Sequence, residues 1–361
     1  MKSEKSLGLF EELGPFRVKD YGATVYSNDY SWNLFANVLF LESPSGVGWS
    51  FNTYGKLNTT DDEVSQHNYQ ALVDFLRKFP EYHGRDTFIT GESYAGVYVP
   101  TLAVKILKDK ENFPNFKGIA IGNGALNFLH NYDTMFPLYY YHGLVRDEYI
   151  FNATNDLDPY NIYNTCYSTV AVGKKAHIER FMRKDVGVPP RTGAVRQRQS
   201  SVPLCDQIGN TEDYLNRADV RKALHIPTSL PRWQDCSARM ISKTACMESK
   251  GDRQTRHDNK TPVISVLLWR TATFVTHYDM TPEIEEIISA GVKGKERVNE
   301  PWRYLGENPT VAGFLIKYEG GLDFLTVRGS GHFVPGDKPR EALQMIYNFV
   351  SGHDYSRPTP F

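Results

Sequence analysis

The sequence predicts an α/β fold with a mostly parallel central sheet and helices on both faces. Two observations support this: apolar runs of strand length alternate with helical periodicities between residues 36 and 121, and turn residues separate these runs. Such alternation is typical of parallel sheets, because each crossover helix covers a face of the sheet. The chain has 361 residues, 40% of them hydrophobic. That is enough for a large core, and we expect one domain over residues 1–361.

The first strand and helix are predicted before residue 80. Ala36–Leu41 is a continuous apolar run, which suits a strand buried on both faces, and the turn-rich residues that follow end it. Thr60 and Glu63 stand three residues apart, as in a capping box. Apolar residues then repeat at helical spacing until Pro80, so we expect a helix between these points.

The alternation continues with a strand at Thr87–Thr90, a helix that ends near Lys108 and a strand at Gly118–Ile121. Between the first strand and the helix stands GESYAG, Gly91–Gly96, in which small residues flank Ser93. They allow a sharp turn that holds the hydroxyl out of the backbone, as in the nucleophile elbow of α/β-hydrolases. The helix that follows directs its positive dipole end toward the same place. The pentapeptide Gly-x-Ser-x-Ala also occurs by chance in unrelated proteins.

Beyond about residue 131 the alternation stops, which predicts an inserted cap region over about residues 131–277. Residues 171–203 hold eight Lys and Arg, a Pro-Pro pair and no apolar periodicity, so we expect an exposed basic loop there. The remaining predicted elements are a cap helix at Glu212–His225, a return to the core at Tyr278–Glu283, a last strand at Asp323–Gly329 and a last amphipathic helix at Pro339–Val350.

Charge and hydropathy exclude several classes of protein. The formal net charge is −1, so there is no global attraction to nucleic acid or to an anionic membrane. No apolar run approaches the roughly 20 residues of a membrane span, and we expect a soluble protein. The start, MKSEKSLGLF, has no stretch that resembles a signal peptide. Three glycosylation sequons, at Asn58, Asn152 and Asn259, give weak support for secretion.

The four cysteines, Cys166, Cys205, Cys236 and Cys246, lie close together in the sequence. An even number permits two disulfides, with three possible pairings, and reduced core cysteines are the alternative. No Cys-x-x-Cys spacing occurs, so a zinc ribbon is not indicated. We expect neither a metal nor an organic cofactor.

Four motifs together resemble one family. They are GESYAGVYVPTLA, GLFEELGP (Gly8–Pro15), NVLFLESPSGVGWSF (Asn37–Phe51) and GSGHFVPGDKP (Gly329–Pro339). In this order they resemble the serine carboxypeptidases, relatives of lysosomal cathepsin A, from about Ser6 to Val350. The resemblance implies an α/β-hydrolase fold with an inserted cap, peptide substrates, and a secreted or lysosomal location. It also implies that residues 171–203 form a protease-sensitive excision loop, and relatives include homodimers.

The candidate catalytic residues are Ser93 and His332. A serine hydroxyl needs a nearby imidazole to take its proton. His332 follows the last predicted strand in a Gly-Ser-Gly-His loop, where an α/β-hydrolase places its base. The backbone N–H of Tyr94, the residue after the nucleophile, is the first expected oxyanion donor.

The resemblance implies that Glu12 and Glu92 form a carboxyl pair that recognises the C-terminal carboxylate of the peptide. Two carboxyls beside a third cannot all ionise at low cost, so the pair must hold protons, which favours an acidic working pH. Phe333 stands where some relatives carry methionine beside the leaving residue, and we expect it in the leaving-residue pocket. Without the resemblance, each of these residues would be interpreted as an ordinary surface or core residue with no role in catalysis or binding.

Two segments depart from the family pattern. MKSEK stands in place of several strands and a Gly-rich motif that would supply a second oxyanion N–H. No aspartate lies between Asp279 and Asp323, where the strand and the acid of the triad are expected. Residues 238–276 also match poorly. Altered exon boundaries or a splice form would give this pattern. Three functions therefore stay open: an active carboxypeptidase, a catalytically impaired binding or protective protein, and an acyltransferase of the same fold.

Overall fold

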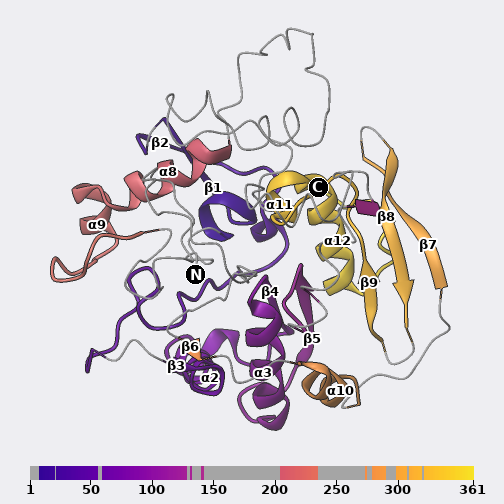
Figure 1. Ribbon diagram of the computed structural model, residues 1–361, viewed down its shortest axis with the longest axis horizontal. Coiled ribbons are helices and arrows are strands. Elements are labelled where there is room, and N and C mark those ends of the chain that lie inside the picture. The colour runs from indigo at the N-terminus through magenta and orange to yellow at the C-terminus, as the bar shows by residue number, and fades with distance from the viewer. Residues whose placement is uncertain are drawn as a thin grey trace, which may run out of the picture.

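The structure is a computed structural model, and its strands and helices form a mixed α/β arrangement (Figure 1). It describes residues 8–20, 22–55, 59–127, 131, 140–141, 204–234, 273–274, 279–289, 298–306, 309–318 and 321–361. Within these ranges the strands form four small sheets, in place of the single, mostly parallel sheet that the sequence predicts.

The N-terminal part consists of short elements around a β-hairpin. They are the π-helical turn η1 (Gly8–Glu12), β1 (Phe16–Lys19), β2 (Thr24–Ser27) and the 3₁₀ turn η2 (Trp32–Leu34). β1 and β2 pair antiparallel. Gly22, in the turn between them, has φ +80°, and a Cβ there would lie 2.5 Å from the backbone nitrogen of Tyr214. Only glycine fits this turn without displacing the neighbouring helix.

The central βαβ unit confirms the predicted alternation. Its elements are β3 (Thr59–Thr60), α2 (Asp61–Lys78), η3 (Pro80–Tyr82), β4 (Thr87–Glu92), α3 (Ala95–Lys108) and β5 (Phe116–Gly122). The predicted capping box is present, because the Glu63 N–H donates to Thr60 Oγ1 and the Thr60 N–H donates to Glu63 Oε2. β4 and β5 are parallel, and β3 pairs in parallel with β6 (Thr273–Phe274).

Helices pack on both faces of the β4–β5 pair. On one face, Ile89 and Ile119 contact a buried cluster that includes Val97 of α3 and Met280, just before α10 (Thr281–Ser289). On the opposite face, Phe88 makes an edge contact with Phe349 of α12, with ring centroids 5.6 Å apart. Figure 1 shows α3 and α12 with the two strands between them. The alternation of side chains along a strand therefore gives each helix its own apolar surface.

The prediction of a strand at Ala36–Leu41 is wrong. These residues pair with no other strand in the described part of the chain, and Leu39 is 45% exposed instead of buried. A strand is defined by its hydrogen-bonding neighbours, so an apolar run without one remains irregular. β4 has β5 as its partner in the described ranges, and its other edge lacks the neighbour that the sequence predicts.

The C-terminal part is an antiparallel sheet followed by two helices. Its elements are β7 (Val298–Tyr304), β8 (Thr310–Lys317), β9 (Asp323–Leu325), α11 (Val334–Asp337) and α12 (Pro339–Ser351). β9 is shorter than the predicted strand at Asp323–Gly329. At Thr326, hydrogen bonds that involve side chains replace part of the regular backbone pairing. The Trp302 indole N–H donates to the Thr326 carbonyl at 2.9 Å, and the Phe314 N–H donates to the Thr326 hydroxyl at 2.9 Å. The predicted last helix is confirmed by α12.

Two helices replace the single cap helix predicted at Glu212–His225: α8 (Leu204–Leu215) and α9 (Ala218–Ala223). The helix is interrupted at Asn216. The Asn216 side chain donates to the Trp233 carbonyl and accepts from the Trp233 N–H, both at 2.8 Å. Arg217 has extended backbone angles, φ −61° and ψ 140°, and these end the helical path. An amide that pairs with a distant backbone competes with helix continuation.

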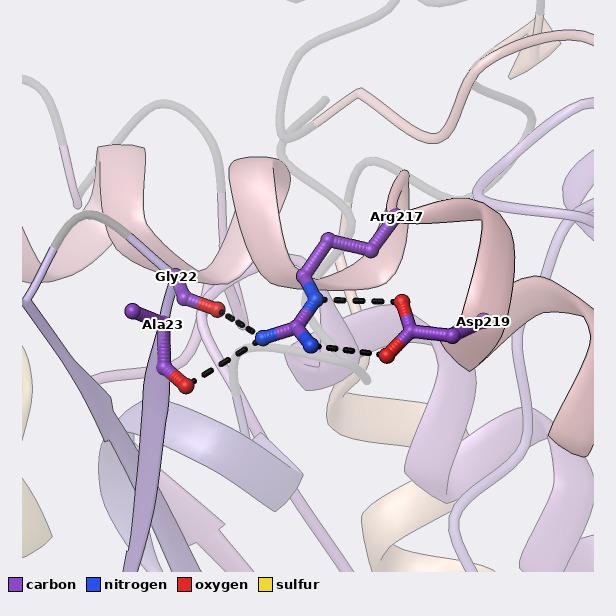
Figure 2. Close-up of polar contacts among 4 residues, drawn as sticks. All are labelled: Gly22, Ala23, Arg217 and Asp219. Carbon is purple, nitrogen blue, oxygen red and sulfur yellow. Dashed lines mark hydrogen bonds and ion pairs between the residues drawn. The ribbon is translucent and has the colours of Figure 1, made fainter.

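Arg217 joins this break to the N-terminal hairpin. Figure 2 shows its guanidinium between the carbonyls of Gly22 and Ala23 on one side and Asp219 on the other. The Nη1 group donates to the two carbonyls at 3.0 and 3.2 Å, and the opposite edge of the guanidinium donates to both Asp219 oxygens. The fork-shaped guanidinium can satisfy all these acceptors at once.

Several predictions lie outside the described residues. They are the basic loop at 171–203, most of the cap at 131–277, the three sequons, and the side chains of the four cysteines. Within the described ranges, no helix combines the length and the apolar character that crossing a bilayer requires.

Candidate active site

Ser93 occupies the turn between β4 and α3. Its φ is +61°, in the left-handed region, and its residue exposure is 8%. A side chain at Gly91 would bring a Cβ to 2.4 Å from the Ala95 Cβ, so the turn needs glycine there and a small residue at 95. The sequence Gly-x-Ser-x-Ala therefore gives the strained strand-to-helix turn that the motif predicts.

The last residue of β5 and the loop that follows it hold the backbone of Ser93 from both sides. The Ser93 N–H donates to the Gly122 carbonyl at 3.0 Å, and the Ala125 N–H donates to the Ser93 carbonyl at 2.9 Å. A Cβ at Gly96 would lie 2.5 Å from the Ala125 nitrogen, so this loop and the start of α3 are in close contact. Together these contacts leave the nucleophile turn little freedom to relax.

Tyr94 follows Ser93 at the N-cap position of α3. Its ring is 1% exposed, and its hydroxyl donates to Asp61 Oδ1 at 2.9 Å. Asp61 is fully buried at the first position of α2. The side chain of Tyr94 thus ties the start of α3 to the start of α2. Its backbone lies at the N-terminal, electropositive end of a helix, which is suited to an oxyanion.

His332 lies in the loop between β9 and α11. Its Nε2 is 3.7 Å from Glu92 Oε1, and the two side chains are 18% and 19% exposed. The distance permits an ion pair when the imidazole is protonated. The His332 carbonyl accepts a hydrogen bond from Asn123 Nδ2 at 2.8 Å, and the Gly331 N–H donates to Asp337 Oδ2 at 2.7 Å. Since Glu92 directly precedes Ser93, the imidazole is brought beside the nucleophile turn.

Phe333 follows His332 in the sequence, and Glu12 lies in an element that contacts α11. The Phe333 ring makes an edge contact with the His332 ring, with centroids 5.2 Å apart, and α11 begins at the next residue. Glu12 is buried at the end of η1, which contacts α11. In Figure 1 the indigo turn of η1 lies beside the yellow α11. Phe333 therefore directly precedes α11, and Glu12 lies in a turn that contacts this helix.

A half-buried arginine, Arg17, stands beside Glu12. The Arg17 guanidinium donates to the Glu12 carbonyl. Burial lowers the pKa of Arg17 from its ordinary value, while the nearby Tyr26, Glu12 and Glu11 act in the opposite direction. An arginine stays protonated at working pH all the same, so a positive charge lies near the acidic residues of η1.

Two residues of this region were missed by sequence reasoning. Asn123 bridges β5 to the His332 loop, and Asp61 anchors the Tyr94 ring. The sequence held a signal for each: Asn123 lies in a Gly-Asn-Gly turn directly after a predicted strand, and Asp61 follows the capping threonine. Within the described ranges, no group of three or more His, Cys, Asp or Glu residues could hold a metal ion.

Comparisons with known proteins agree with the resemblance. The family model described as serine carboxypeptidase matches residues 3–352. The chain is 48% identical to serine carboxypeptidase ctsa-4.1 of Caenorhabditis elegans, covering 97% of this chain and 82% of that protein. It is 32% identical to the lysosomal protective protein of Mus musculus, over 96% and 82% of the two chains.

A solved structure shows the same fold. It is that of Kex1(delta)p, a prohormone-processing carboxypeptidase from Saccharomyces cerevisiae, with a TM-score of 0.63 and 18% sequence identity. The match covers 97% of this chain and 81% of that one. At this identity the similarity concerns the fold alone.

Proposed function

Because the chain belongs to the serine carboxypeptidase family, we propose that it removes the C-terminal residue of peptides through an acyl-enzyme formed on Ser93. The observation that carries the proposal is the geometry of the elbow. Ser93 stands on a left-handed turn, and the His332 imidazole lies 3.7 Å from the carboxylate of the residue just before it. The proposal includes a single domain with a cap at about residues 131–277, and a secreted or lysosomal location.

The reaction uses Ser93 as nucleophile and His332 as base. The hydroxyl oxygen attacks the carbonyl carbon of the last peptide bond while its proton passes to the imidazole. The oxyanion that forms is stabilised by the Tyr94 N–H at the start of α3. The C–N bond then breaks, and the imidazolium gives its proton to the departing amino acid. Water, activated by the same imidazole, releases the acylated part of the peptide.

Glu92 stands within ion-pair distance of His332, at the edge of the proposed reaction centre. With Glu12 it would bind the C-terminal carboxylate of the substrate, and this binding requires the pair to hold protons. A carboxyl that must be protonated for binding predicts higher activity in mildly acidic solution. Phe333, beside His332, would contact the side chain of the residue that leaves.

The test is release of the C-terminal residue from N-blocked dipeptides at about pH 5, near the working pH expected for a carboxyl pair. The wild-type chain should show turnover and should react with a fluorophosphonate at Ser93. Ser93→Ala should abolish both while leaving the circular dichroism spectrum unchanged. Folded wild-type protein that neither turns over nor reacts would overturn the proposal.

A second candidate is a catalytically impaired family member that binds peptides. The observation that favours it is the absence of any aspartate between Asp279 and Asp323, where the acid of the triad is expected. Substitution of that acid in a serine protease lowers kcat by about 10⁴. Binding of an N-blocked dipeptide that is equal in wild type and Ser93→Ala, without turnover in either, would support this candidate.

A further inference from the structure

The end of β5 and the loop that follows it contact both proposed reacting residues, although these two residues are far apart in the sequence. The Gly122 carbonyl accepts a hydrogen bond from the backbone N–H of Ser93 at 3.0 Å. The next residue, Asn123, donates from Nδ2 to the His332 carbonyl at 2.8 Å and to the Gly331 carbonyl at 3.3 Å. One dipeptide thus fixes the nucleophile with its backbone and the base with its side chain.

The identity of residue 123 matters for its backbone as well as for its side chain. Its φ is +45°, in the left-handed region, where asparagine is enriched several-fold among residues other than glycine. Only an amide also provides an NH₂ group that can donate to two carbonyls at the same time. Glycine would fit the backbone but lacks the donor, and alanine lacks the donor and is strained.

The two carbonyls that Asn123 binds belong to the segment whose placement decides where the imidazole lies. The Gly331 N–H also donates to Asp337 at the end of α11, the helix that directly follows the loop, whereas Asn123 reaches across from the end of β5. The hydrogen bonds from Asn123 therefore fix the loop relative to the elbow, and the bond to Asp337 fixes it only relative to α11. A displacement of about 1 Å at a catalytic group can reduce the rate about 100-fold.

We propose that Asn123 is a positioning residue, which holds the His332 loop against the nucleophile turn so that the imidazole reaches Ser93. This inference rests on the proposed function for its effect on turnover. It does not require Asn123 to contact the substrate. It extends the set of residues needed for the reaction from the elbow and the histidine loop to the end of β5.

The first experiment measures the loop itself. Amide hydrogen exchange of the peptide covering residues 329–338 is compared in wild type, Asn123→Ala and Asn123→Gly. Both variants should exchange faster in this peptide, with the peptides of α2 and α3 unchanged. The matched control is Asn115→Ala: Asn115 precedes β5 at its other end, is half-buried, and donates in the same way to a backbone carbonyl, that of Gly84. The control should leave the 329–338 peptide unchanged.

The second experiment measures catalysis on the same variants. Asn123→Gly should lower kcat by about 10- to 100-fold with KM within about twofold of wild type, because the base is misplaced while the substrate site is kept. The rate of Ser93 labelling by a fluorophosphonate should fall in parallel. Asn123→Asp keeps the shape but replaces the donor by an acceptor, so it should be no better than Asn123→Gly. Asn115→Ala should keep the wild-type kcat.

The outcomes separate the two hypotheses. Unchanged exchange of residues 329–338 in Asn123→Gly overturns the positioning role, whatever the activity. Faster exchange with an unchanged kcat overturns it as well, since the loop would then not need this bond for catalysis. If the wild type shows no turnover but the Asn123 variants exchange faster at residues 329–338, the result supports the anchoring of the loop by Asn123 and counts against the proposed function. Faster exchange with reduced kcat and unchanged KM supports both.

Discussion

Replacing Tyr94 by phenylalanine should destabilise the fold while leaving the backbone of the elbow in place. The Tyr94 hydroxyl donates to Asp61 at 2.9 Å, and both residues are almost completely buried. A hydrogen bond to a charged group contributes about 1.5–3 kcal/mol, and its loss leaves a buried carboxylate with one donor fewer. The ring itself remains, so no cavity forms. We therefore expect Tyr94→Phe to lower the free energy of unfolding by about 2 kcal/mol, or about 30-fold in the folding equilibrium.

Urea unfolding followed by tryptophan fluorescence measures this loss. With a slope of about 3 kcal/mol/M, the midpoint should fall by about 0.7 M. Tyr54→Phe is the matched control, because Tyr54 is 93% exposed and should leave the midpoint unchanged. In a double-mutant cycle with Asp61→Ala, which removes the acceptor, the coupling should be about 1–2 kcal/mol. Effects that add to within about 0.3–0.5 kcal/mol would refute the assigned bond. The N–H of residue 94 is kept, so turnover per folded molecule should change little.

Three further substitutions test the elbow, the proposed carboxyl pair and the hydrogen bond between Tyr69 and Asp109. Gly96→Ala places a Cβ 2.5 Å from backbone after β5 and should lower the thermal midpoint and kcat, whereas Gly118→Ala meets only a ring carbon at 3.6 Å and should be mild in a thermal melt. Glu92→Gln should keep much of the acidic activity and gain relative activity near neutral pH, and an unchanged pH–rate profile would contradict the carboxyl pair. The hydrogen bond from Tyr69 holds the pKa of Asp109 below its ordinary value. Its stabilisation is complete above the unfolded pKa of about 4 and is lost as pH falls through the lower folded value. The difference in melting temperature between wild type and Tyr69→Phe should therefore shrink as pH falls below about 4.

The elements that the sequence predicted correctly are those with a local signal. The capping box of Thr60 and Glu63, the Gly-x-Ser-x-Ala turn around Ser93 and the periodicity of α12 each depend on residues a few positions apart. The apolar run Ala36–Leu41 carries the same kind of signal, but within the described residues no strand pairs with it, so composition alone gave a wrong result. Pairing is a property of distant segments, which no local pattern contains.

The same distinction applies to the site. The positions of Ser93 and His332 were predicted from motifs, and the structure brings the histidine beside Glu92. The bond from Asn123 to the His332 loop spans more than 200 residues and depends on where β5 ends relative to α11. Nothing in the residues near Asn123 specifies that partner. Motifs in the sequence indicate Ser93 and His332 as the proposed reacting groups, whereas the contacts that hold these two residues can be identified only from the fold.

The guanidinium of Arg217 binds main-chain oxygens of the N-terminal hairpin, and this choice of acceptor determines which substitutions the hairpin can accumulate. The carbonyl of residue 23 is available with any side chain, so the bond places no restriction on Ala23. Gly22 is restricted for a separate reason, its left-handed φ and the backbone of Tyr214 close by. The two neighbours should therefore diverge at very different rates between related chains, although the same guanidinium holds both. An anchor of this kind can persist while the surface it holds changes its sequence, as long as the arginine and the one glycine are kept.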